Sequence, residues 1–203
     1  MKKLSTRVIV SAMALCLAIV GCQKAQNEAG ICRIHGTMES AQWDGKRIFL
    51  VPMFGPKDSA HVDSLVIENG KFEFEVDTAE LKIIRIDYHF RSGTQDLLVI
   101  TEPGDVYVTI GGVSTGGGTP QNDSLQVWKD KLQEFSIAYA QVRQRAQAEG
   151  SDSILMTEGK AIQQELRDFN KAFAQRQPDG ILKEYFNKMY PYTANKADEK
   201  TAE

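Results

Sequence analysis

The chain has 203 residues, 42% hydrophobic and 25% charged, a composition that excludes a collagen, a disordered chain and a polytopic membrane protein. Removal of the first 21 residues would leave 21 basic and 27 acidic residues, a formal charge of −6. A body this acidic is a poor candidate for nucleic-acid binding, which requires basic residues to neutralise phosphates.

The first residues are organised like a secretory signal peptide. Lys2, Lys3 and Arg7 give a positively charged start, and residues 8–20 form an apolar stretch interrupted only by Ser11. This stretch is shorter than the roughly 20 residues of a membrane-spanning helix. We therefore predict that residues 1–21 are a signal peptide that is cleaved.

The end of this stretch, Ile19-Val20-Gly21-Cys22, resembles a bacterial lipobox, in which a cysteine after a small residue is lipidated and becomes the mature N-terminus. The resemblance implies a palmitate-type lipid on Cys22, a tether over residues 22–30 and attachment to a membrane through the lipid alone. Gln23 stands where enteric bacteria place an inner-membrane retention aspartate, so we expect a periplasm-facing outer-membrane lipoprotein. The alternative is a secreted protein without lipid.

Only one thiol remains after these assignments. Cys16 would leave with the signal peptide and Cys22 would carry lipid, so Cys32 has no partner for an intramolecular disulfide, and the chain has no C-x-x-C motif. Cys32 lies in a predicted strand, where a buried structural thiol is the expected state. A reactive thiol is the alternative.

Residues 31–112 are predicted to form an antiparallel β domain. Residues 71–76 alternate strictly between polar and apolar side chains, and Asn69-Gly70 before them is typical of a type I′ turn, which predicts a hairpin with residues 62–67. Glu102-Pro103-Gly104-Asp105 predicts a further turn between two strands. About seven strands in all indicate a β-sandwich or open barrel; they cover residues 31–36, 47–51, 62–67, 71–76, 84–90, 97–101 and 106–110.

Beyond a glycine-rich linker at residues 113–119, the pattern becomes helical. Thr119 is a candidate N-cap with Pro120 at the first helical position. Apolar residues then recur at spacings of three and four; this seam consists of Leu125, Trp128, Leu132, Phe135, Tyr139, Val142 and Ala146.

A second helix is predicted from about Ser153, after the break at residues 149–152, with an apolar face of Leu155, Ile162, Leu166, Phe169 and Phe173. The two helices would form an antiparallel hairpin, followed by a short third helix at residues 181–189 within a helical region of residues 120–190. Residues 191–203 are expected to be a disordered tail. The predicted fold class is α+β.

Four motifs in this order resemble a β-rich domain of unknown function found at the N-terminus of Bacteroidetes lipoproteins, commonly ahead of a thioredoxin-like domain of the thiol-disulfide interchange type. They are Ile34-His35-Gly36, residues 67–74, Ile100-Thr101-Glu102-Pro103-Gly104, and residues 118–123. The resemblance covers about residues 30–125 and implies a lipoprotein. The chain has no Trp-Cys-x-x-Cys motif, so no residue here matches the redox site of those relatives.

Several residues are of types that could bind a metal ion, a nucleotide or a ligand, but a simpler explanation is available for each. His35, His61 and His89 are scattered singly over three elements, so we expect no metal site. Glycines 116–118 precede a helix but lack the lysine of a phosphate-binding loop, so we expect no nucleotide or other cofactor. Trp43, Phe54, Tyr88, Phe90 and Tyr107 would either line a sugar- or peptide-binding sheet face or belong to the core.

The sequence contains no catalytic constellation, so we expect a non-catalytic cell-envelope lipoprotein that acts as a binding module or adaptor. Trp128, Phe135 and Tyr139 of the helical seam are the predicted partner surface, for another envelope protein or for a second copy. The alternative is an accessory component of periplasmic thiol-disulfide exchange that associates with a thioredoxin-like protein, with Cys32 as a mixed-disulfide partner. Glycan binding by the sheet is a third hypothesis.

Overall fold

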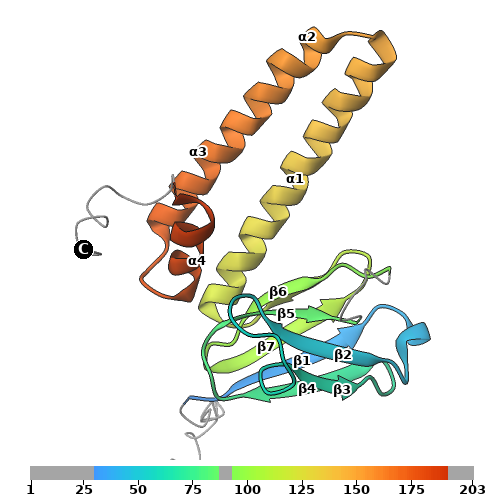
Figure 1. The fold of residues 1–203 in the computed structure, drawn as a ribbon, viewed down its shortest axis with the longest axis vertical. Helices are drawn as coiled ribbons and strands as arrows, with labels where there is room; N and C mark the ends of the chain where they lie inside the picture. The colour runs from blue at the N-terminus through green and yellow to red at the C-terminus, as the bar shows by residue number, and fades with distance from the viewer. Residues whose placement is uncertain (1–29, 87–92, 192–203) are drawn as a thin grey trace, which may run out of the picture.

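The computed structural model describes residues 30–86 and 93–191 (Figure 1). Cys22, the predicted signal peptide, Tyr88, His89, Phe90 and nearly all of the predicted tail therefore lie outside the described residues. The described part is an α+β fold with two four-stranded sheets followed by helices, as predicted, and the sheets do not close into a barrel. The strands are β1 (Cys32–Met38), β2 (Arg47–Pro52), β3 (Asp63–Val66), β4 (Lys71–Val76), β5 (Leu81–Arg85), β6 (Leu97–Ile100), β7 (Gly104–Ile110) and β8 (Thr115–Gly117).

The two sheets pack face to face as a sandwich. Their strand orders are β4-β1-β7-β8 and β3-β2-β5-β6, and every pair is antiparallel except β1 with β7. Alternate side chains of both sheets point inward, as the period of two predicts. The resulting core includes Cys32, Ile34, Phe72, Phe74, Val106 and Val108 from the first sheet and Ile48, Leu50, Ile84, Leu97 and Val99 from the second.

The predicted hairpin at residues 62–76 is correct in its turn and wrong in its strand pairing. Asn69 (φ 53°) and Gly70 (φ 69°) have the positive φ angles that a type I′ turn requires. However, β3 pairs with β2 and β4 pairs with β1, and the turn itself is closed by a single bridge between Glu68 and Lys71. The turn is a corner at which the chain passes from one sheet to the other.

The segment after β6 is a second such corner. The turn signal at residues 102–105 predicts that the flanking strands pair with each other, but β6 pairs with β5, and β7 pairs with β1 and β8. Gly104, at φ 130°, begins β7 in a backbone conformation that favours glycine. Both pairing predictions are wrong for the same reason: the residues of a turn determine where the chain reverses, but they do not determine with which strand the next strand pairs.

The predicted glycine-rich linker contains the additional strand β8. Gly116 pairs with Val108, and a Cβ atom at Gly116 would lie 3.1 Å from the Val108 side chain. At Gly118 (φ 109°), a Cβ atom would lie 2.5 Å from the Asp105 carbonyl oxygen. Tight packing against the Val108 side chain at Gly116, and close approach of the Asp105 backbone at Gly118, therefore explain these two glycines better than linker flexibility does.

The helical part agrees with the prediction in its overall plan. Helix α1 begins at Pro120 and ends at Glu149, with Gly150 as its C-cap in the left-handed conformation, and it forms a hairpin with α3 that projects from the sheets (Figure 1). The predicted second helix is interrupted by a π-helical turn. The elements are α1 (Pro120–Glu149), α2 (Asp152–Ile154), the π turn (Leu155–Gly159), α3 (Lys160–Arg176) and α4 (Ile181–Met189). None of the helices within residues 30–86 and 93–191 is long and apolar enough to span a membrane.

A second core attaches the helices to the sandwich. Leu81 of β5 and Ile100 of β6 pack there with residues of α1, α3 and α4, which include Leu125, Trp128, Phe173, Leu182, Tyr185 and Phe186. Trp128 is buried in this core, and its indole N–H donates to Asn170 Oδ1 at 2.9 Å. The prediction that Trp128 is part of a partner surface is therefore wrong, because α4 covers the end of the seam that carries it.

A hydrogen-bonded junction joins the two motifs at residues 100–104 and 118–123. The Glu102 carboxylate accepts from the backbone N–H groups of Gln121 (2.7 Å) and Asn122 (3.3 Å) in the first turn of α1. Thr119 is the N-cap residue, but its side chain makes no capping bond to the backbone. The cap comes from Glu102 because the second corner of the sandwich places that carboxylate at the helix terminus.

Candidate functional site

A groove between α1 and α3 contains two of the three predicted partner residues, Phe135 and Tyr139. It has a cavity volume of about 580 Å³. The apolar lining residues are Leu132, Phe135, Tyr139, Ile162 and Leu166, and the polar ones are Lys129, Gln133, Ser136 and Gln163. The two helices therefore do not bury their apolar faces completely against each other.

The floor of the groove is held in place by packing beneath it. The Phe135 ring lies 6.0 Å from the Phe169 ring of α3. Tyr139 packs over Gly159 at the end of the π turn, where a Cβ atom would lie 3.3 Å from Tyr139 Cε2. The groove is therefore a preformed feature of the hairpin.

The rim of the groove is basic. On α1, positions spaced by three and four from the lining residues Gln133 and Ser136 form a stripe of Lys129, Gln133, Ser136, Ala140 and Arg143. The corresponding stripe on α3 consists of Lys160, Gln163 and Arg167. The two stripes contain Lys129, Arg143, Lys160 and Arg167. Two acidic residues lie beside them: Asp130 is three residues before Gln133 and its charge acts on Lys129, and Glu165 is three residues after the lining residue Ile162. The basic rim contrasts with the net acidic body.

Lys129 is the cation closest to the apolar floor. Its amine lies 3.5 Å from the Leu98 carbonyl oxygen, and burial lowers the pKa of Lys129 to about 8. The charged amine is thus poorly solvated in the free protein. A carboxylate bound in the groove would stabilise its charge and offset the lost hydration.

Replacing Lys129 by methionine is expected to raise the free energy of unfolding at pH 7 by about 1–2 kcal/mol. Below pH 8 the amine is charged in both the folded and the unfolded protein, so the full desolvation cost is present. Between pH 8 and the ordinary lysine pKa of 10.5 only the folded-state amine loses its proton, so the stability of the natural protein rises and the advantage of Lys129→Met disappears. Urea unfolding of both proteins at pH 7 and pH 10 measures this; an equal difference at both values would contradict it.

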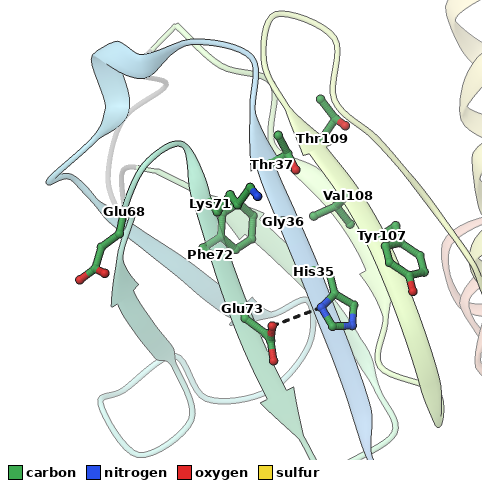
Figure 2. Close-up of a pocket in the computed structure, with 10 residues that line it drawn as sticks. All are labelled: His35, Gly36, Thr37, Glu68, Lys71, Phe72, Glu73, Tyr107, Val108 and Thr109. Atoms are coloured by element: carbon green, nitrogen blue, oxygen red, sulfur yellow. Dashed lines mark hydrogen bonds and ion pairs between the residues drawn. The ribbon is translucent and has the colours of Figure 1, made fainter. Parts of the chain in front are cut away.

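The outer face of β4, β1 and β7 carries a second candidate surface (Figure 2). His35 of β1 lies between Glu73 of β4 and Tyr107 of β7, which are its partners in strand register. Its Nδ1 atom is 3.2 Å from Glu73 Oε2 and its Nε2 atom is 3.0 Å from Asp105 Oδ1. The imidazole also stacks on the Tyr107 ring, with centroids 5.1 Å apart and planes inclined by 23°.

This arrangement fixes His35 and leaves it without a free nitrogen. Because each ring nitrogen already faces a carboxylate, neither one is available to take a proton from a substrate or to bind a metal ion. His61 is bonded to Asp58 in an exposed loop, at 2.6 Å. In the described residues no group of three or more His, Cys, Asp or Glu side chains is placed to hold a metal ion.

Two of the aromatic residues proposed for a sheet face, Trp43 and Phe54, are not part of this surface. Trp43 packs against the sandwich core, and Phe54 packs against the second core, with the Lys188 amine 3.8 Å from its ring centroid. Tyr107 is the exception, since 60% of it is exposed. No local sequence pattern predicts the stacking of Tyr107 on His35, which depends on the register of two strands that are distant in the chain.

Cys32 is fully buried in the sandwich core. Burial, together with the nearby carboxylates of Glu102 and Asp105, raises the pKa of the Cys32 thiol to about 11. A thiol in this state is a poor nucleophile and a poor partner for a mixed disulfide.

Alkylation of Cys32 by iodoacetamide at pH 8 is expected to be about a hundredfold slower in the folded protein than in concentrated guanidinium chloride. Mass spectrometry of the tryptic peptide that contains Cys32 follows the reaction. Similar rates in the two states would show that the thiol is accessible and would restore the hypothesis of a redox role.

The glycines before α1 do not form a phosphate-binding loop. The N–H groups of Gln121 and Asn122, which would contact an anion at this helix terminus, already donate to Glu102. The Gly118 N–H donates to Asp123 Oδ1 at 2.7 Å. The protein's own carboxylates thus occupy the positions that a phosphate would need.

Comparison with known proteins finds a family resemblance for one part of the chain. A family model described as "Domain of unknown function (DUF4369)" matches residues 32–125, a range that comprises the eight described strands and the start of α1. No curated protein and no solved structure matches the chain. The sandwich with its helix-capping corner, residues 32–125, is therefore similar to this family of domains of unknown function.

Proposed function

We propose that this protein is a non-catalytic adaptor of the cell envelope that is anchored to the outer membrane through lipidated Cys22. Its groove between α1 and α3 binds an acidic amphipathic helix of another envelope protein. The observation that carries this proposal is the combination of an apolar floor, which includes Phe135 and Tyr139, with a rim on which basic residues outnumber acidic ones and Lys129 lines the groove itself.

The shape and chemistry of the groove fit a helical segment. An amphipathic helix places apolar side chains at spacings of three and four into a groove of this kind, and its flanking residues meet the rim. Carboxylates on those flanks would pair with Lys129, Arg143 and Lys160. Such a segment would also remove the remaining apolar floor from water.

A second copy of the chain fits the groove less well. A two-fold symmetric contact through the groove would bring one rim against the identical rim of the partner. Four basic residues on each side would then repel one another. A different protein is therefore the favoured occupant.

The envelope location rests on the signal-peptide and lipobox patterns at residues 1–22 and on the lipoprotein resemblance. That resemblance also suggests a thioredoxin-like protein as one partner worth identifying. Burial of Cys32 argues that such an association would be non-covalent.

A photo-crosslinking amino acid at Gln163 tests the proposal in cells that produce the full lipoprotein. Gln163 lines the groove, whereas the neighbouring Gln164 bonds to Asp168 outside the rim and provides a matched control. We expect crosslinks from position 163, and not from position 164, to an acidic helical segment of one envelope protein, and we expect Lys160→Glu with Arg143→Glu to abolish them. A synthetic peptide of that segment should bind the purified lipoprotein more weakly as salt increases.

Three results would contradict the proposal. Equal capture from positions 163 and 164 would mean that the groove is not specific. Crosslinks to a second copy would identify self-association, and crosslinks to phospholipid alone would identify a membrane-binding face.

A further inference from the structure

The Tyr107 ring is a large aromatic group exposed on the outer face of the sandwich. It lies on β7, which is flanked by β1 and β8 within the first sheet, yet 60% of the residue is exposed. Its partner on β8 is Gly117, which has no side chain to cover it. A Cβ atom at Gly118 would lie 3.0 Å from Tyr107 Cδ2, so glycine at that position also keeps the side of the ring clear.

The ring is also rigidly supported. His35 stacks on it from β1, and Glu73 and Asp105 hold His35 from both sides. Three strands thus cooperate to fix one exposed aromatic ring, although an exposed ring contributes little to the stability of the core. Holding these side chains in one arrangement costs conformational entropy that core stability does not require, which suggests that the ring has a binding function.

A depression of about 610 Å³ lies beside this stacked pair (Figure 2). Hydroxyl groups of Thr37 and Thr109, the amine of Lys71 and the carboxylates of Glu68 and Glu73 line it, together with His35 and Tyr107. Donors and acceptors are therefore mixed, and Glu68, Lys71 and Glu73 place charges of both signs along β4 and the turn before it. This lining does not favour a strongly charged ligand of either sign.

We propose that this depression binds a neutral carbohydrate, with the Tyr107 ring stacked on the apolar face of a sugar and the surrounding polar groups bonded to its hydroxyls. A pyranose ring has an apolar C–H face that packs on an aromatic ring, and each of its hydroxyls both donates and accepts. The site is separate from the groove between α1 and α3 and does not depend on the function proposed for that groove.

Isothermal titration of the purified mature lipoprotein, in a detergent without a sugar head group, tests this site. The probes are neutral tetrasaccharides of glucose, mannose, xylose and N-acetylglucosamine, with a sulfated glycan as the charged comparison. We expect at least one neutral probe to bind, Tyr107→Ala to weaken it by roughly tenfold or more, and Tyr107→Phe to retain most of the affinity. Phe135→Ala in the groove is the matched control and should leave the affinity unchanged.

Failure of every neutral tetrasaccharide to bind would overturn the proposal, and so would equal binding by Tyr107→Ala. Binding of the sulfated glycan alone would show that charge, and not stacking, governs the surface. Because Tyr107 is exposed, circular dichroism of the variants should match the natural protein and separates loss of binding from loss of the fold.

Discussion

Replacing Asn122 by alanine is expected to lower the free energy of unfolding by about 2–4 kcal/mol. Asn122 is only 2% exposed, and its amide replaces a neighbouring strand at the edge of β6. Its Oδ1 accepts from the Ile100 N–H at 2.9 Å, and its Nδ2 donates to the Ile100 carbonyl at 2.7 Å and to Thr119 Oγ1 at 2.8 Å. Alanine would leave both backbone groups of Ile100 buried without these partners.

Urea unfolding followed by circular dichroism measures this effect, with two comparison variants. Gln133→Ala, at an exposed position of the same helix, should change the free energy of unfolding by less than about 0.5 kcal/mol. Thr119→Ala should cost less than Asn122→Ala, because Thr119 makes no capping bond to the backbone. A larger effect at Thr119 than at Asn122 would mean that conventional capping, and not the junction with β6, holds the start of α1.

Features encoded by neighbouring residues could be predicted from the sequence. The third helix has the predicted bounds of residues 181–189, α1 begins at Pro120, and Asn69-Gly70 forms its turn. In each case a few adjacent residues determine the backbone conformation, through periodicity, a fixed proline φ angle or tolerance of positive φ. The burial of Cys32 was expected because free cysteine is among the most frequently buried residue types.

Features that depend on contacts between distant residues could not be predicted in the same way. Both corners of the sandwich look like hairpins in the sequence, because a turn does not reveal which sheet the next strand joins. The site around His35 combines residues 35, 73, 105 and 107, which meet only when three strands are in register. No pattern of neighbouring residues in the sequence predicts that these four residues lie together.

The groove between α1 and α3 could be predicted from the sequence only in part. Its apolar residues belong to the predicted seam, but the seam alone does not show that α4 covers Trp128 and leaves Phe135 and Tyr139 open. The basic rim had a readable signal, since Lys129 and Arg143 recur at helical spacing beside the seam. Charge pattern at that spacing was therefore an overlooked signal for the basic residues beside the groove.

Replacing Phe186 by alanine is expected to have the largest effect on stability, a loss of about 3–5 kcal/mol. Phe186 is 0% exposed, and its ring lies 5.3 Å from the rings of both Trp128 and Phe173. It therefore joins α4 to α1 and α3 at the centre of the second core. Alanine would remove this contact and leave a cavity that the surrounding rings fill only in part.

Unfolding of Phe186→Ala in urea, followed by tryptophan fluorescence and by circular dichroism, tests this role. Met189→Ala on the same helix is the control, since Met189 is 44% exposed and should matter little. We expect the fluorescence of Trp128 to change as its environment loosens, while the sandwich retains its strand signal until the main transition. A loss below about 1 kcal/mol would mean that α4 is not an integral part of the second core, and Trp128 would then become accessible as part of the partner surface.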